Sequence, residues 1–178
     1  MFKKELNKEN IKTNHKLNVA VITLSDRASK GIYEDLSGKY ICETLSKYLE
    51  ENNWQFEIDY SLMPDDADLL RSKLLIYKEK QFDIIFTTGG TGVGLRDITP
   101  EVVKPLLDKE IPGIMELIRV KHGMTIPNAV LSRGVCGFMG TSQVYTLPGS
   151  VKAVKDYMYE IQKTLEHLIF MYWGIDSH

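Results

Sequence analysis

One stretch of the chain constrains its fold more than any other. The apolar run at residues 82–86 is followed at once by Thr-Thr-Gly-Gly-Thr-Gly over residues 87–92. Short, nearly continuous apolar runs are typical of strands that are covered on both faces in parallel sheets. Glycines directly after such a strand expose backbone N–H groups at its carboxyl end, where open α/β sheets usually bind phosphate-bearing ligands. The stretch therefore predicts a buried parallel strand and the functional edge of its sheet.

The rest of the chain alternates between strand patterns and helix patterns. We expect strands at residues 17–24 and 56–62 and short strands within 129–146. We expect helices at 36–49, 69–77, about 114–122 and 151–168. Thr99, Pro100 and Glu101 predict a further helix start, with the threonine as N-cap and the proline at the first helical position. This alternation predicts an α/β fold with a mostly parallel sheet.

Length and charge restrict the class of protein. At 178 residues and 43% hydrophobic, the chain can form one well-packed domain, which we expect over residues 17–178. Residues 1–16 are polar and should form a tail or a loose helix. A net charge of −2 argues against a nucleic-acid partner. No apolar run reaches the roughly 18 residues that a membrane span needs, and the N-terminus is charged, so we expect no membrane partner and a cytoplasmic location.

Cysteine and histidine chemistry is not indicated. Cys42 and Cys136 lack CxxC spacing and predict two small buried side chains in a reducing compartment. The four histidines show no metal-ligand spacing, which argues against a zinc site. The sequence also shows no Ser/His/Asp or Cys/His arrangement typical of a catalytic nucleophile and its base.

Three further loops follow predicted strands, and each allows two interpretations. Ser25, Asp26 and Arg27 together suit a polyanionic ligand, or they form a solvated turn with a helix cap. After the second strand, Asp65 or Asp66 is either a functional acid or a cap for the next helix. The third loop, residues 148–150, is a turn with an N-cap, or it binds an anion at the start of the last helix.

Two carboxylates flank the glycine loop in the predicted fold. Asp65 follows one strand, and Asp97 comes shortly after the glycines. Bare carboxylates would repel phosphates, so this pairing favours Mg²⁺ held between them. The glycine loop is neither a Walker motif nor a dinucleotide fingerprint. The residues therefore predict nucleotide or phosphoryl chemistry without a specific substrate.

Five motifs in one order resemble a known family. They are Ser-Asp-Arg-Ala-Ser at 25–29, Thr-Thr-Gly-Gly-Thr-Gly at 87–92, Arg-Asp-Ile-Thr-Pro-Glu at 96–101, Leu-Ser-Arg at 131–133 and Leu-Pro-Gly-Ser at 147–150. This pattern is similar to that of the molybdopterin adenylyltransferases of molybdenum cofactor biosynthesis, whose domain recurs in gephyrin. The resemblance covers about residues 17–158. It implies a three-layer sandwich around a mostly parallel sheet.

The resemblance also implies a reaction and a set of site residues. Mg²⁺ and ATP would adenylylate the terminal phosphate of molybdopterin and release pyrophosphate. Asp65 and Asp97 match the family's two functional acids, which are candidate catalytic residues and Mg²⁺ ligands. The residues implied in substrate binding are Ser25, Asp26, Arg27, Thr88, Gly89, Gly90, Thr91, Gly92, Ser132, Arg133, Pro148, Gly149 and Ser150, with Ser132 on the pterin side. A homotrimer and a hand-off to a molybdenum insertase are implied as well.

Some positions depart from the family pattern. Val151 stands where the family often has a proline, and residues 134–140 follow the usual pattern only in part. Two alternatives stay open: a sister branch that binds the pterin with an uncertain catalytic role, and a scaffold or binding module. The motifs at 25–27 and 63–65 favour the active branch, and a scaffold would not need both acids.

Overall fold

A six-stranded sheet lies at the centre of the computed structural model, which describes residues 8–175. Its strands are β1 (Lys16–Leu24), β2 (Gln55–Met63), β3 (Ile84–Thr88), β4 (Lys109–Glu110), β5 (Cys136–Met139) and β6 (Ser142–Leu147). The strand order is β2-β1-β3-β6-β5-β4. Strands β2, β1, β3 and β6 are parallel, whereas β5 and β4 are added antiparallel at one edge. The predicted α/β class with a mostly parallel sheet is confirmed.

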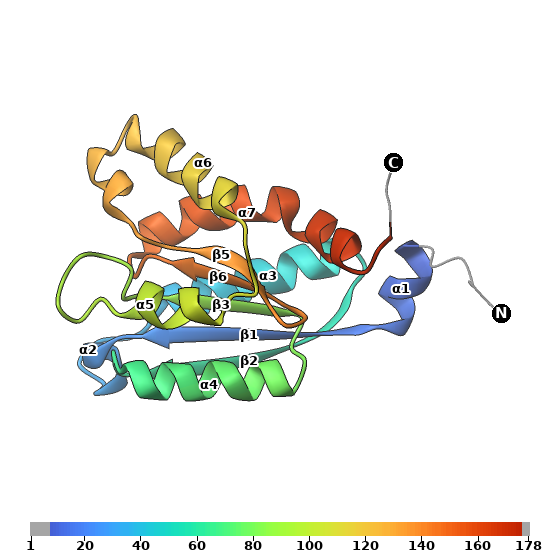
Figure 1. The fold of residues 1–178 in the computed structure, drawn as a ribbon, viewed down its shortest axis with the longest axis horizontal. Helices are drawn as coiled ribbons and strands as arrows, with labels where there is room; N and C mark the ends of the chain where they lie inside the picture. The colour runs from blue at the N-terminus through green and yellow to red at the C-terminus, as the bar shows by residue number, and fades with distance from the viewer. Residues whose placement is uncertain (1–7, 176–178) are drawn as a thin grey trace.

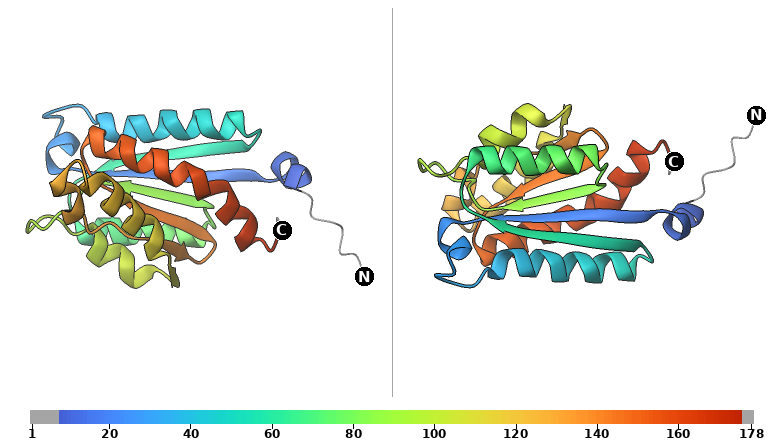
Figure 2. Two further views of the ribbon diagram at one scale, coloured as in Figure 1. Left: turned by 90° about the horizontal axis from the view of Figure 1, so that it is seen from above. Right: turned by 90° about the horizontal axis from the view of Figure 1, so that it is seen from below.

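Helices cover both faces of the sheet and complete three layers (Figures 1 and 2). The helices are α1 (Lys8–Asn14), α2 (Asp26–Ser29), α3 (Leu36–Glu51), α4 (Ala67–Glu79), α5 (Thr99–Val103), α6 (Pro112–Gly123) and α7 (Val151–Tyr172), with 3₁₀ turns η1 (Lys104–Leu106) and η2 (Pro127–Leu131). Helices α3, α6 and α7 pack on one face, and α4 and α5 pack on the other. None of these described helices is long and apolar enough to span a membrane.

Strand β1 shows why its sequence is apolar almost throughout. Its residues Leu17, Val19 and Val21 pack into the layer with α3 and α7, whereas Ala20 and Ile22 pack into the layer with α4. All five are fully buried. Each side chain of Val or Ile size contributes about 1.5–3 kcal/mol when it is removed from water. A polar residue on either face of β1 would therefore weaken a core layer.

The register of the sheet brings four loops together. Leu62 of β2 and Thr88 of β3 both pair with Thr23 of β1, and Thr88 pairs in turn with Leu147 of β6. These four residues form one row across the carboxyl ends of four parallel strands. The loops that follow therefore start side by side, as the sequence predicts. They lie at the end of the molecule opposite α1 (Figure 1).

Several predicted details differ from the structure. Thr99 is the first residue of α5 and not its N-cap, because its hydroxyl donates to the Gly89 carbonyl at 2.8 Å instead. Residues 129–131 belong to the 3₁₀ turn η2, which begins at Pro127, so strands occupy only the later part of 129–146. Helix α7 continues to Tyr172, four residues beyond the predicted end.

The chain termini test the predicted tail only in part. Residues 1–7 lie outside the described residues, and α1 occupies much of the remainder of the predicted tail, with Ile11 buried. The division into a tail of residues 1–16 and a domain of residues 17–178 stays a prediction.

The two cysteines are free, as expected. Cys136 is buried, whereas Cys42 is only partly buried. Burial raises the pKa of the Cys136 thiol to about 12 and that of Cys42 to about 11. Neither thiol is therefore activated for nucleophilic attack.

Candidate active site

The loops at the carboxyl edge of the sheet enclose a cavity of about 1030 Å³. This volume suits a large ligand or two ligands together. The predicted site residues that line it are Ser25, Asp26, Arg27, Asp65, Thr88, Gly89, Gly90, Thr91, Gly92, Asp97, Ser132, Pro148, Gly149 and Ser150. Arg133 is the one predicted site residue that does not line it. The structure therefore brings nearly the whole predicted set into one cavity.

The glycine loop after β3 has a backbone that larger residues rarely adopt, and it leaves no room for their side chains. Gly89 has φ +100°, and a Cβ there would lie 2.2 Å from the Leu24 carbonyl oxygen. Gly90 has φ +65°, and a Cβ there would lie 2.6 Å from Thr99 Oγ1. The glycines therefore let the loop pass directly against β1 and α5 while its backbone faces the cavity.

The loop after β6 is fixed to the glycine loop. The Gly89 N–H donates to the Leu147 carbonyl at 3.0 Å, and the Thr88 hydroxyl donates to the Pro148 carbonyl at 2.7 Å. A Cβ at Gly149 would lie 3.3 Å from Gly89 Cα. The start of α7, with its partial positive charge, is thereby held beside the glycine loop, an arrangement that favours an anion.

Asp26 and Asp65 bind each other's backbone. The Asp26 N–H donates to Asp65 Oδ2 at 2.9 Å, and the Asp65 N–H donates to Asp26 Oδ1 at 3.1 Å. The Arg96 guanidinium donates to both carboxylate oxygens of Asp26 at 2.7–2.9 Å. Loops after two neighbouring strands are therefore joined, and Arg96 ties a third loop to them.

The two carboxylates differ in charge environment. The hydrogen bond from Arg96 lowers the pKa of Asp26. Burial raises the pKa of Asp65, and the negative charges of Asp26 and Asp97 raise it further. Asp65 is therefore a partly buried carboxylate near like charges, a situation that favours a bound cation.

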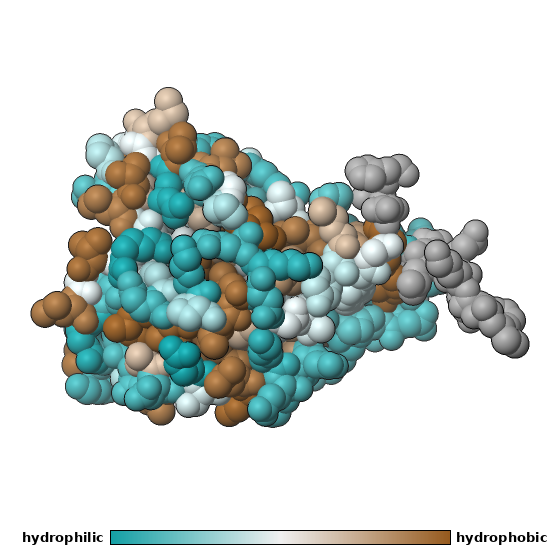
Figure 3. All heavy atoms as spheres, viewed as in Figure 1, coloured by the Kyte–Doolittle hydropathy of each residue, from teal (hydrophilic) through white to brown (hydrophobic). Residues whose placement is uncertain are grey.

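Asp97 lies in the loop between the glycines and α5. Its Oδ2 accepts a hydrogen bond from the Gly94 N–H at 2.7 Å. A Cβ at Gly92 would lie 2.7 Å from the same oxygen, so the loop is compact around this carboxylate. The tip of the loop is open to solvent, because Val93 is 76% and Leu95 102% exposed. Figure 3 shows apolar side chains protruding at this end of the molecule.

The donor set fits a magnesium ion that is shared with phosphates. Asp65 and Asp97 line the same cavity, and Asp97 contributes to the raised pKa of Asp65. Within residues 8–175, no three His, Cys, Asp or Glu side chains are grouped as a metal site. Mg²⁺ is usually bound by one or two carboxylates together with substrate phosphates, so the pair meets this requirement without a complete protein cage.

The capping interpretations hold for three of the candidate residues. Ser25 caps α2 by accepting from an N–H at 3.2 Å, and Ser150 caps α7 in the same way at 3.4 Å. After β2, Asp66 is the cap of α4, with Oδ1 accepting two N–H bonds at 3.0 and 2.9 Å. Asp65 does not cap this helix; its Oδ2 accepts from the Asp26 N–H, and the residue lines the cavity.

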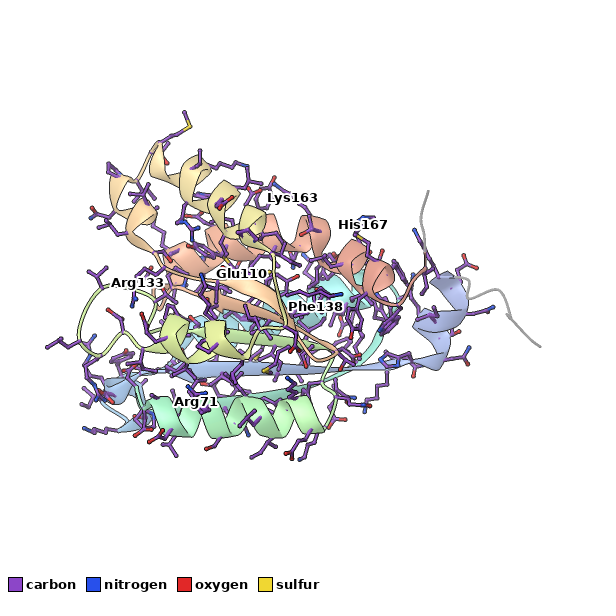
Figure 4. All side chains as sticks on the ribbon, in the orientation of Figure 1. Arg71, Glu110, Arg133, Phe138, Lys163 and His167 are labelled. Carbon is purple, nitrogen blue, oxygen red and sulfur yellow. The ribbon has the colours of Figure 1, made fainter. Side chains whose placement is uncertain are left out.

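Arg133, labelled in Figure 4, is bonded to both ends of the loop between Gly92 and Asp97. Its guanidinium donates to the carbonyls of Gly92 at 2.6 Å and Asp97 at 3.0 Å, and it pairs with Glu101. These contacts explain its position next to the cavity. Its predicted contact with substrate stays a prediction.

Asp35 is a buried residue that the sequence prediction missed. Its Oδ2 accepts from the hydroxyls of Thr23 and Tyr60 at 2.6 Å each, and its Oδ1 accepts two N–H bonds at the start of α3. From the same helix end, Ser37 Oγ donates to the Gly149 carbonyl at 2.8 Å. The available signal was an Asp directly before a helical pattern. No local pattern indicates its hydrogen bonds to Thr23 of β1 and Tyr60 of β2.

A second missed group forms the wall of the cavity beside α6 and α7. His122, Asp156 and Tyr157 all line it. His122 Nδ1 lies 3.5 Å from Asp156 Oδ2, whereas His122 Nε2 is buried without a hydrogen-bond partner among the described residues. Burial raises the pKa of Tyr157. These residues are far apart in the sequence and share no motif, so only the fold reveals the group.

Comparison with known proteins agrees with this geometry. Residues 20–167 match the family described as "Probable molybdopterin binding domain". The molybdopterin adenylyltransferase of Helicobacter pylori J99 is 39% identical over 159 residues, which cover 89% of each chain. The solved structure of the molybdopterin biosynthesis enzyme MoaB from Thermus thermophilus is similar with a TM-score of 0.79 and 34% identity, covering 89% of this chain and 97% of that one. The tungsten cofactor synthesizing protein MoaB from Pyrococcus furiosus has a TM-score of 0.77 and 36% identity, with 88% and 96% covered.

Proposed function

The chain belongs to the family of probable molybdopterin-binding domains, and on this premise we propose that it adenylylates molybdopterin in molybdenum cofactor biosynthesis. In this reaction the terminal phosphate of molybdopterin attacks the α-phosphorus of ATP. A P–O bond forms to the α-phosphorus, the bond to the β-phosphate bridging oxygen breaks, and pyrophosphate leaves. The product is adenylyl-molybdopterin.

One observation carries the proposal. The register of four parallel strands brings Asp65, the glycine loop and the start of α7 to one cavity, and the compact loop before α5 adds Asp97. A glycine loop and a helix start attract phosphates, whereas two carboxylates repel them unless a cation lies between. Together they suit the transfer of a nucleotidyl group more than simple binding of a neutral ligand.

The residues of the chain position the two substrates. We assign the nucleotide phosphates to the glycine loop, Gly89 to Gly92, and to the loop Pro148 to Ser150. Ser132 lies on the wall beside α6 and is assigned to the pterin side. Because in-line attack needs little covalent work from the protein, holding both substrates in one cavity supplies much of the rate.

Asp65 and Asp97 are assigned as the catalytic carboxylates that would hold Mg²⁺. When bound, this ion neutralises charge on the transferring and leaving phosphates. The Arg96 guanidinium pairs with the negative charge of Asp26 and lowers the pKa of that carboxyl. Asp65 is the carboxylate beside the assigned phosphates whose pKa is raised.

The assembly and location also belong to the proposal. Apolar side chains are exposed along α6 and η2 and in the segment between them, including Val120 of α6 at 64% and Met124 directly after it at 84%. Exposed apolar surface of this kind supports association between copies, and we propose the homotrimer that the family resemblance implies. We further propose a cytoplasmic location and a hand-off of the product to a molybdenum insertase.

The test is a reconstitution with purified protein, ATP, Mg²⁺ and molybdopterin, read by pyrophosphate release. We expect release only when all four components are present. Omitting molybdopterin controls for plain ATP hydrolysis, and EDTA should stop the reaction. Binding of molybdopterin without pyrophosphate release would instead support the non-catalytic sister branch or a binding module.

A further inference from the structure

The wall of the cavity beside α6 and α7 carries a carboxylate of its own. Asp156 and Tyr157 lie in the second turn of α7, and His122 lies in the last turn of α6. Asp26 and Asp65 follow β1 and β2, on the other side of β3 in the strand order. Asp156 therefore lies one turn beyond the start of α7, to which the nucleotide phosphates are assigned, on the wall that α7 shares with His122 of α6.

The acceptor oxygens of Asp156 are available to a ligand. The cavity carboxylates Asp26, Asp35, Asp65 and Asp97 all accept hydrogen bonds from backbone or side-chain donors within the protein. Among the described residues, Asp156 has only His122 at 3.5 Å, an ion-pair distance longer than a direct hydrogen bond. Its side chain is 33% exposed.

A buried nitrogen of His122, the residue that pairs with Asp156, also lacks a hydrogen bond: among the described residues, His122 Nε2 has no partner. Tyr157 is 4% exposed, and burial raises its pKa while a hydrogen bond with the Ser132 side chain lowers it. Buried polar groups are nearly always paired, so the unpaired nitrogen of His122 shows that this wall is less completely bonded within the protein than the carboxylates after β1 and β2.

A carboxylate selects heterocyclic rings that present two adjacent N–H donors on one edge. Two oxygens side by side accept from two adjacent N–H donors in the manner of a bidentate pair. The 2-amino-4-oxopyrimidine half of a pterin offers such an edge, with N3–H next to the 2-amino group. Adenine offers a donor next to an acceptor and does not match.

We propose that Asp156, positioned by His122, binds the N3–H and 2-amino group of the pterin and sets the specificity of the site for a 2-amino-4-oxo ring. This inference rests on the proposed function, whose substrate carries that ring. The adenine of ATP is then excluded from this wall of the cavity, so the two substrates cannot exchange places.

Two small probes test the proposal directly. Pterin and lumazine differ at one position, because lumazine has a carbonyl where pterin has the 2-amino group. We expect the wild type to bind pterin on the order of tenfold to a hundredfold more tightly, measured by fluorescence titration. The Asp156→Asn variant should reverse this preference, since its amide presents one acceptor and one donor, which match N3–H and the 2-carbonyl of lumazine.

Two control variants separate recognition from folding. Asp59→Asn removes a carboxylate on β2 that lies 3.8 Å from Lys73 and outside this cavity, so the preference for pterin should not change. His122→Gln should weaken pterin binding but keep the preference, because the carboxylate remains. A wild type that does not prefer pterin, or an Asp156→Asn variant that still does, would overturn the proposal.

The outcome is distinguishable from a failure of the proposed function. Binding of pterin and lumazine requires neither ATP nor turnover. Selection of pterin through Asp156 without pyrophosphate release would keep this inference and refute the adenylyl transfer. Pyrophosphate release, combined with a ring preference that Asp156→Asn leaves unchanged, would support the adenylyl transfer and refute this inference.

Discussion

At the scale of single residues, the backbone of Gly89 is the most restrictive feature of the site. We predict that Gly89→Ala destabilises the fold by at least about 3 kcal/mol, because it adds both strain at positive φ and a clash with the Leu24 carbonyl. Gly31 is the matched control: its φ is +70°, but nothing lies within 4 Å of a Cβ there. Gly31→Ala should cost only about 1 kcal/mol. Urea unfolding midpoints measure both, and equal losses would show that the close approach of β1 does not matter.

The charge environment of Asp65 predicts a pH dependence. Burial and neighbouring carboxylates raise its pKa, whereas the positive charge of Arg96 lowers it. Asp65 must be ionised to hold a cation, so activity is lost as the pH falls through this raised pKa. Arg96→Gln removes the opposing charge, and we expect the acid limb of kcat/KM to move to higher pH, since the carboxyl is then protonated at a higher pH.

A second arginine provides the control for this profile. Arg71 lies on α4 (Figure 4) and does not line the cavity. Arg71→Gln should leave the acid limb where it is. A limb that does not move in Arg96→Gln, or that moves equally in both variants, would contradict the assignment of this limb to Asp65.

At the scale of elements, Asp35 joins the start of α3 to two strands. Asp35→Ala would leave the Thr23 and Tyr60 hydroxyls and two helix N–H groups without their acceptor. We predict a loss of at least about 3 kcal/mol in unfolding free energy. The exposed cap Asp66 is the comparison, since Asp66→Ala removes only two N–H bonds and should cost about 1 kcal/mol. Similar losses in the two variants would mean that the bonds to the strands contribute nothing.

The bounds of the strands and helices also show which parts of the fold the sequence alone predicts. β1 and β2 match their predicted ranges within a residue, because strands covered on both faces or alternating along one face leave a local apolar pattern. The end of α7 and the 3₁₀ turn η2 lie outside the predicted elements, since the exact bounds of helices depend on packing and on end geometry that a local pattern does not contain.

The same distinction holds for the candidate site. Asp65 and the glycine loop follow strands directly, so the parallel topology alone brings them together. Asp156 and His122 come from different helices, and no spacing in the sequence connects them. Thr99 satisfies the pattern of a cap, but its hydroxyl bonds to Gly89 instead, a tertiary contact that a local pattern cannot predict.

At the scale of the whole molecule, we predict a trimer in solution. Light scattering at micromolar concentration should give a mass near three times the 20.3 kDa of one chain. The number of copies follows from the family resemblance, and the exposed apolar surface on α6 and η2 favours association because it is costly to leave in water. A mass of 20.3 kDa would show a monomer and refute this assembly.

The central claim is that the loops at the sheet edge form a catalytic centre for adenylyl transfer, with Asp65 and Asp97 as its acids. The most direct measurement is turnover beside melting temperature for Asp65→Asn, Asp97→Asn and the adjacent Asp66→Asn. We predict that the first two keep the fold but lose on the order of a hundredfold or more in turnover. Asp66→Asn should stay near the wild type in both, because asparagine caps a helix as well as aspartate. Near-normal turnover in both Asp65→Asn and Asp97→Asn would contradict the catalytic assignment.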